Sequence, residues 1–326
     1  KKINPVIKWF WGLFAAAIVG VLLLFVAASV GLLGEMPDFQ HLENPETNLA
    51  TEIVTADGKS LGKFYLDENR TPIKFKDLPK HLVDALIATE DERFYEHSGI
   101  DIRGTIRAMV YLGSKGGAST ISQQLAKQLF HKEKTRGIAR YTQKIKEWII
   151  ATRLEKQYTK EEILTMYFNI YDFNNNADGI RSASRIYFGK EPRDLKIEEG
   201  ATLVGMFKNS SLYNPRRNPQ GVINRRNVVL AQMVKNHYLT IKEKDSLEKL
   251  PLKLNFHPEG HNEGIATYFR EHLRNYMKEW AKNNPKPDGS KYDIYSDGLK
   301  IYTTIDSRMQ AAAEERSEEH TSELQS

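Results

Sequence analysis

The residues best suited to chemistry lie in one short stretch, Glu90–Gly99, which reads EDERFYEHSG. The stretch joins carboxylates, an aromatic ring and a histidine where an apolar helical pattern, Leu82–Thr89, stops. Asp77 and Pro79 are start signals for that helix, so Glu90 falls in its last turn. The negative end of a helix dipole disfavours a charged carboxylate, which suits a general base. A solvated acidic helix end is the alternative.

A second stretch, Gly116–Lys127, reads GGASTISQQLAK. Its glycine pair lets the backbone approach a ligand closely, and Ser119 or Thr120 can cap the helix that follows. Free N–H groups at a helix start attract anions, and Lys127 lies two turns further along, within reach of a diphosphate. A glycine-hinged loop with an ordinary cap is the alternative.

A third stretch, Arg140–Trp148, reads RYTQKIKEW. Its apolar residues form one helical stripe, and Arg140, Lys144 and Glu147 recur on another face at i, i+4 and i+7. This face presents two cations and one carboxylate. A solvated face of ion pairs is the alternative.

Two further stretches complete the pattern. The fourth follows the capping box Thr159–Glu162 and runs from Tyr167 to Lys190, and the fifth runs from Glu198 to Leu230. We expect the fourth to scaffold a site and not to react.

In this order, the five stretches resemble the signatures of the peptidoglycan glycosyltransferases, a lysozyme-like family found in class A penicillin-binding proteins and in monofunctional enzymes. The first signature is Glu90-Asp91-x-x-Phe94-x-x-His97-x-Gly99. The resemblance implies a mainly α fold, with a lysozyme-like helical glycosyltransferase domain over residues 51–245, an N-terminal transmembrane helix and a small β-hairpin.

The resemblance implies that the enzyme polymerises lipid II, with lipid-linked glycan as the donor. Glu90 would take the proton from the 4-hydroxyl of the acceptor as that oxygen attacks the anomeric carbon, with inversion. Glu147 is the second implied catalytic residue; it would orient a lysine or hold a divalent cation, Mg or Mn. Cations would neutralise the leaving diphosphate. The implied substrate-binding residues are Asp91, Phe94, His97, Ser119, Thr120, Gln123, Gln124, Lys127, Arg140, Lys144 and Lys146.

The sequence departs from the family at two places. Gln143 stands where an arginine usually precedes the lysine, so Arg136, Arg140 or Lys144 would supply that charge. The motif favours Lys146 for the diphosphate while the helical stripe favours Lys144, and the choice stays open. Residues 173–176 read FNNN where the family has an aromatic followed by glycine, and because asparagine tolerates positive φ the turn is expected to survive.

Composition limits the classes of function. The chain has 326 residues, a net charge of +5 and no cysteine, which excludes disulfides, Cys-ligated zinc and thiol chemistry. Residues 127–156 carry nine Lys or Arg against three Glu, and residues 200–242 carry seven against no acid. Such stripes suit a phosphorylated ligand or an anionic membrane. Nucleic acid is not an expected partner, because aromatics at base-stacking spacing are missing. The family implies lipid II, the membrane and other cell-wall synthesis proteins as partners.

A membrane anchor is expected near the N-terminus. Trp9–Leu33 is a run of 25 uncharged residues, which as a helix is about 37 Å long, more than the roughly 30 Å hydrocarbon core. The lysines of residues 1–8 and the acids after residue 33 leave the tail 1–8 in the cytoplasm. A single-pass protein of the inner membrane with a periplasmic catalytic domain is therefore predicted. A cleaved signal peptide is the alternative.

The remaining segments give a provisional domain plan. Residues 34–50 are expected as a linker, and Asp57-Gly58 predicts the hairpin turn. Residues 246–297 are expected as a linker region with a helix near 265–282. Residues 298–315 resemble the first strand of a transpeptidase domain, expected to be truncated because no Lys-Thr-Gly follows. Residues 316–326 are expected to be a non-native tail.

The segment Asp101–Leu112 has two interpretations. Ile102, Ile106 and Val110 share a helical face, which in the family belongs to a mobile jaw lying partly in the bilayer, and ordinary core packing gives the same pattern. At the level of function, a lysozyme-like glycan hydrolase and a non-catalytic cell-wall scaffold are the alternatives. A cationic surround argues against the hydrolase, because a neutral leaving group does not require it.

Overall fold

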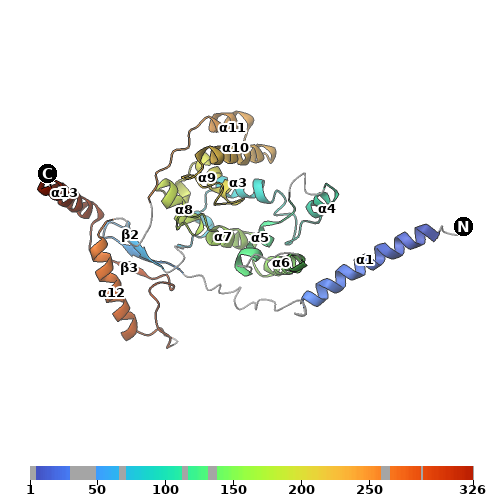
Figure 1. The fold of residues 1–326 in the computed structure, drawn as a ribbon, viewed down its shortest axis with the longest axis horizontal. Coiled ribbons are helices and arrows are strands. Elements are labelled where there is room, and N and C mark those ends of the chain that lie inside the picture. Colours follow the sequence, from blue (N-terminus) through green and yellow to red (C-terminus); the bar gives the residue numbers. More distant parts are fainter. Residues whose placement is uncertain are drawn as a thin grey trace. The chain divides into compact units, whose positions relative to one another are not determined.

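The computed structural model describes residues 5–29, 49–65, 71–111, 117–130, 138–257, 265–287 and 289–325 (Figure 1). The chain forms two compact units, each described by itself. Unit 1 comprises residues 1–45 and 93–163, and unit 2 comprises residues 46–92 and 164–326. The fold is mainly helical, as predicted, and its described residues include one small three-stranded sheet.

The helices of unit 1 are α1 (Pro5–Ser29), α4 (Ile102–Val110), α5 (Ile121–Phe130) and α6 (Ile138–Gln157), and α7 (Lys160–Ile170) continues into unit 2. The helices of unit 2 are α3 (Lys80–Glu90), α8 (Gly179–Phe188), α9 (Ile197–Met206), α10 (Pro219–Lys235), α11 (Ile241–Glu248), α12 (Thr267–Asn283) and α13 (Ser307–Gln325). Two short 3₁₀ helices, η1 (Phe75–Asp77) and η2 (Pro192–Asp194), lie in the same unit.

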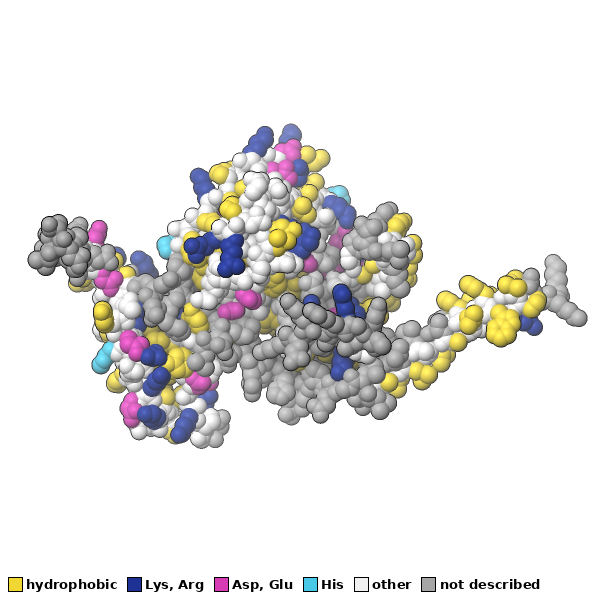
Figure 2. Space-filling view, in the orientation of Figure 1, with side chains coloured by type: hydrophobic (Ala, Val, Ile, Leu, Met, Phe, Trp, Pro, Cys, Tyr) yellow, Lys and Arg dark blue, Asp and Glu magenta, His cyan; other side chains and the backbone are white. Residues whose placement is uncertain are grey.

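The transmembrane helix predicted over residues 9–33 is not confirmed. Helix α1 covers residues 5–29, and residues 30–33 lie outside the described part of the chain. Among the described residues, no helix meets the length and hydropathy required of a membrane span. Hydrophobic side chains line the exposed surface of α1 (Figure 2).

Helix α4 leaves its apolar face in solvent. Ile102, Ile106 and Val110 are 68%, 54% and 68% exposed. Asp101 begins the helix by accepting a hydrogen bond from the Gly104 N–H (3.0 Å), as a cap does. The interpretation of this face as core packing is therefore wrong.

The helical core of unit 2 is built by α3, α9 and α10, which pack against one another (Figure 1). Leu82 and Leu86 from α3 are fully buried, as are Leu203 from α9 and Val229 from α10. Helix α3 ends at Glu90, as its sequence pattern predicted, so this core fixes where the Glu90 side chain begins.

The sheet of unit 2 has the order β2-β1-β3. Strands β1 (Thr51–Val54) and β2 (Ser60–Phe64) form the predicted antiparallel hairpin, and β3 (Lys300–Tyr302) pairs parallel to β1. The hydrophobic residues of the hairpin pack with α12 in a separate cluster. The region 246–297, expected as a linker, therefore contributes a helix to a hydrophobic core.

Arg185 connects this sheet to the helices. Its guanidinium lies 2.9 Å from Glu52 on β1 and 2.6 Å from Glu191, and Glu191 also pairs with Arg181 at 2.8 Å. Burial alone would raise the pKa of Glu52, but the charge and hydrogen bond of Arg185 hold it below its ordinary value. The pair is thus a buried ionic contact between distant segments.

Replacing Arg185 by alanine should destabilise unit 2. Glu52 is 7% exposed and would lose the cation that donates a hydrogen bond to it, leaving, among the described residues, only the charges of Lys63 and Arg181 nearby. We expect this loss to cost about 3 kcal/mol. Urea denaturation should show this as a lower midpoint. The control Lys282→Ala removes an exposed i,i+3 pair with Glu279 and should cost less than about 1 kcal/mol. An equal loss of unfolding free energy in the two variants would contradict the stabilising role assigned to the Arg185–Glu52 pair.

Candidate functional site

Glu90 is the last residue of α3 and lies beside Arg225 of α10. Its Oε1 is 3.6 Å from the Nη2 of Arg225, and the two side chains are 14% and 11% exposed. The Nε of Arg225 also donates to the Gly205 carbonyl at the end of α9 (3.3 Å). An anchored cation therefore faces this carboxylate in a largely dehydrated position.

Two tyrosines stand close to the same carboxylate. Burial raises the pKa of Tyr167 and Tyr171, and the negative charge of Glu90 raises both further. The Tyr171 hydroxyl donates to the Met206 carbonyl (2.7 Å), and its ring lies 4.2 Å from that of Phe207. Neutral phenols and aromatic faces thus form one side of the surroundings of Glu90.

The residues after Glu90 end the helix. The buried Asp91 is its C-cap, and its N–H donates to the Ile87 carbonyl (3.0 Å). Glu92 pairs with Lys235 at 2.6 Å. The chain enters unit 1 at residue 93, so Glu90 and Asp91 belong to unit 2, and Phe94 and His97 belong to unit 1.

Lys160 fixes the segment 93–97, where the chain returns to unit 1. Its Nζ donates to the His97 carbonyl (2.7 Å), pairs with Glu155 (2.7 Å) and lies 4.2 Å from the centroid of the Phe94 ring. Phe94 is fully buried. The buried Phe94 side chain therefore holds the segment 93–97 in place, and the half-buried His97 lies beside the Phe94 ring.

Gly99 is the point where the first and second predicted stretches meet helix α6. Its φ is +90°, and a Cβ there would come within 2.8 Å of the Ala151 backbone on α6, so only glycine fits. Its carbonyl accepts from Thr120 Oγ1 (2.7 Å) and Gln123 Nε2 (3.1 Å). Both side chains are 1% exposed. Thr120 and Gln123 therefore hold the loop of the first stretch against the second.

Thr120, not Ser119, caps α5, because its Oγ1 accepts from the Gln123 N–H (3.2 Å). This leaves Ser119 for another contact. Lys144 donates to Ser119 Oγ (3.1 Å) and to Glu147 Oε2 (3.0 Å). Since Glu147 is buried and Lys144 is 39% exposed, the cation is fixed at the surface by a buried carboxylate.

The other predicted cations differ in their surroundings. Lys127 and Arg140 are exposed, and neither makes an ion pair with another described residue. Gln124 and Lys146 are half-buried. Arg136, one of the candidates to replace the family arginine at Gln143, lies outside the described residues.

The turn at Asn174, Asn175 and Asn176 keeps the left-handed conformation expected of it. Their φ values are 60°, 55° and 59°. The turn is closed by the Phe173 N–H, which donates to the Ala177 carbonyl (3.0 Å). The prediction that asparagine preserves this turn is confirmed.

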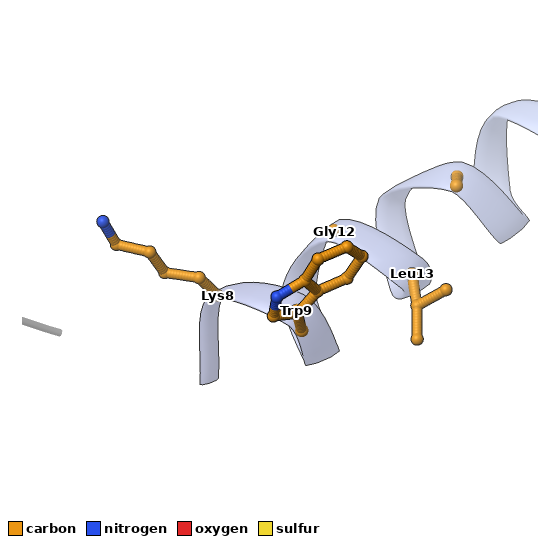
Figure 3. A pocket seen from close by; sticks show the side chains of 5 residues that line it. Lys8, Trp9, Gly12 and Leu13 are labelled. Atoms are coloured by element: carbon orange, nitrogen blue, oxygen red, sulfur yellow. The ribbon is translucent and has the colours of Figure 1, made fainter. Parts of the chain in front are cut away.

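No set of three metal-ligating side chains comes together among the residues that the structure describes. A cavity of about 370 Å³ on α1 is lined by Lys8, Trp9, Gly12, Leu13 and Ala16 (Figure 3). All five come from one helix, and the lining offers one amine, that of Lys8, but no carboxylate, imidazole or hydroxyl group. This cavity therefore contains none of the residues predicted for catalysis.

Sequence reasoning missed two residues that position predicted ones, Arg225 beside Glu90 in unit 2 and Lys160 beside Phe94 in unit 1. Arg225 belongs to the fifth stretch, where two arginines in succession were a signal of function, but its partner Glu90 is far away in the chain. Lys160 was assigned only to the capping box, which the structure confirms through Thr159 and Glu162. The available signal for Lys160 was its position directly after Thr159, the residue that caps the start of α7.

Comparison with known proteins gives one family. The transglycosylase family matches residues 57–234. The chain is 32% identical to penicillin-binding protein 1A of Pseudomonas aeruginosa, over 94% of this chain and 36% of that one, and 35% identical to penicillin-binding protein 1A of Vibrio cholerae, over 86% and 33%. A crystal structure of penicillin-binding protein 1A from Haemophilus influenzae is 25% identical and matches with a TM-score of 0.42, over 82% of this chain and 28% of that one.

This chain thus spans about a third of the length of the curated relatives that it matches. The family match extends over more than half of the 326 residues and contains all five stretches. The chain belongs to the transglycosylase family.

Proposed function

We propose that this chain is a peptidoglycan glycosyltransferase that polymerises lipid II into glycan strands. The observation that carries the proposal is the carboxylate of Glu90, held at the end of α3 with Arg225 3.6 Å away, within the residues that match the family. A carboxylate held in a fixed position can act as a general base toward a hydroxyl group that comes within hydrogen-bond reach. The resemblance of the five stretches supports the same reaction.

In this reaction Glu90 takes the proton from the 4-hydroxyl of the acceptor, lipid II. The freed oxygen attacks the anomeric carbon of the lipid-linked glycan from the side opposite the diphosphate, whose bond to that carbon breaks. The configuration at the carbon is inverted. Arg225 is a positioning residue, since it contacts Glu90 and fixes the direction of its carboxylate.

The departing diphosphate requires positive charge. Lys127 and Arg140 are exposed cations, and Lys144 is held between Ser119 and Glu147. We assign Lys144 the role that the sequence left open between it and Lys146, because a pre-positioned cation loses less entropy on binding an anion. Glu147 orients Lys144. That Glu147 also holds a divalent cation stays a prediction.

Membrane attachment is part of the proposal and rests on two apolar surfaces. The first is the uncharged run of residues 9–33, and the second is the exposed face of α4. A substrate with a lipid tail is reached from the bilayer surface, where a helix with one apolar face binds. The catalytic residues would act on the periplasmic side.

Replacing Glu90 by glutamine should abolish polymerisation. Loss of the general base should reduce kcat by about 10²-fold or more, measured as glycan formed from purified lipid II. The control Glu92→Gln changes a carboxylate two residues away that pairs with Lys235 at the surface, and it should keep activity within about twofold.

The same assay separates the alternatives. A glycan hydrolase would release fragments from preformed glycan, and that release would disappear in Glu90→Gln. A scaffold would show no activity with or without the substitution. Full polymerisation by Glu90→Gln would overturn the assignment of the base.

Replacing Lys144 by methionine should leave Glu147 buried without its cation and remove a charge from the diphosphate. We expect kcat to fall about tenfold or more. The matched control is Lys156→Met, an exposed lysine on the same helix that pairs with no described residue. Lys146→Met is the decisive comparison, because a larger loss there would transfer the role to Lys146.

A spin label should locate the bilayer. Because the chain has no cysteine, Ile106→Cys and Val228→Cys each accept one nitroxide, at exposed positions on α4 and α10. The measured quantity is the ratio of the collision rate of the nitroxide with oxygen to its collision rate with a polar nickel reagent. On addition of vesicles this ratio should rise at position 106 and stay unchanged at position 228, because oxygen concentrates in hydrocarbon. Equal ratios at both positions would exclude contact between α4 and the bilayer.

A further inference from the structure

Unit 2 contains a second cavity, of about 570 Å³, which none of the candidate catalytic residues lines. It lies where the hairpin turn at Gly58, the segment around η1, helix α8, η2 and β3 come together. Its volume is in the range of sites that bind small molecules. The lining residues are Gly58, Pro72, Ile73, Lys74, Lys76, Asp77, Arg181, Arg185, Glu191, Pro192, Arg193 and Lys300.

The lining carries six cations against two acids, Asp77 and Glu191. Glu191 is already paired with Arg181 and Arg185, so it does not neutralise the others. Lys74, Lys76 and Lys300 are exposed and make no ion pair with any residue in the described ranges. Several positive charges that repel one another thus surround one cavity.

The walls that carry these charges are held in place. The Asn169 side chain pins the segment before η1 from both sides, since it accepts from the Ile73 N–H (2.9 Å) and donates to the Ile73 carbonyl (3.0 Å). Arg185, which also lines the cavity, is fixed between Glu52 and Glu191. A preformed cationic wall reduces the ordering cost of binding an anion.

We propose that this cavity binds a multiply charged oxyanion through phosphate or carboxylate groups. Guanidinium and ammonium groups recognise both kinds of oxyanion. Because Glu52 also pairs with Arg185, the six cations of the lining exceed the acids around them by three, which favours a multiply charged anion. The few apolar residues of the lining give little contact to a lipid chain. The inference goes beyond the proposed glycosyl transfer, because none of its residues takes part in that reaction.

Isothermal titration calorimetry on the whole chain tests this inference with two probes, inorganic triphosphate and citrate. Both should bind at low salt and weaken as salt rises, since the charges are partly exposed. The triple variant Lys74→Gln/Lys76→Gln/Lys300→Gln should bind about tenfold or more weakly. If only triphosphate binds, the ligand class is phosphate; if only citrate binds, it is carboxylate.

The matched control is Lys242→Gln/Lys249→Gln/Lys291→Gln, three exposed lysines outside the cavity with no ion pair to a described residue. It makes the same change in net charge and should bind both probes as the unaltered chain does. Circular dichroism checks that both variants are folded. Absence of binding in the unaltered chain, equal affinity in the cavity variant, or an equal loss in the control would each overturn the proposal.

Discussion

The close approach of Gly99 to the backbone of α6 is the constraint on which unit 1 depends. Because no side chain fits there, the Gly99 carbonyl comes close enough to accept from both Thr120 and Gln123. Thr120 is then committed to this buried contact and to the cap of α5, which leaves Ser119 at the surface for Lys144. A glycine without a functional group thus determines where a cation of the proposed site lies. The presence of Gly99 in the first stretch and of Thr120 and Gln123 in the second is thus accounted for by a packing contact between the two stretches.

Unit 2 uses two neighbouring arginines in different ways. Arg225 reaches the Gly205 carbonyl and Glu90, whereas Arg226, 1% exposed, donates to the carbonyls of Glu248 and Leu250 at the end of α11. Successive residues of a helix point about 100° apart, so one side faces the candidate site and the other closes the next helix. Burial lowers the pKa of Arg226, although the charges of Glu198 and Glu248 oppose the shift, and the two carbonyls compensate part of the cost of burial. Arg225 and Arg226 are thus adjacent in sequence but have different roles, so their shared residue type does not predict what each contacts.

The sequence predicted features whose cause is local. The end of α3 at Glu90, the hairpin at Gly58, the cap Thr159 and the turn at Asn174 each follow from propensities of a few adjacent residues. Contacts between distant residues were not predicted, because periodicity carries no information on which faces meet. Arg225 beside Glu90, Lys160 beneath Phe94, and α12 in one core with the hairpin are of this kind. The apolar face of α4 was ambiguous for the same reason, since exposure depends on the neighbours of a helix.

The cations of this chain fall into two physical classes. Arg185, Lys160 and Lys144 each contact a carboxylate that is at most partly exposed, and this contact fixes where each cation lies. Lys127 and Arg140 in unit 1, like the cavity lysines of unit 2, face solvent and have no anion among the described residues. Uncompensated charge is retained at a cost in self-repulsion, which an external anion relieves. In unit 1, the diphosphate of the proposed substrate therefore gains affinity from the exposed cations Lys127 and Arg140 and orientation from Lys144, which Ser119 and Glu147 hold in place.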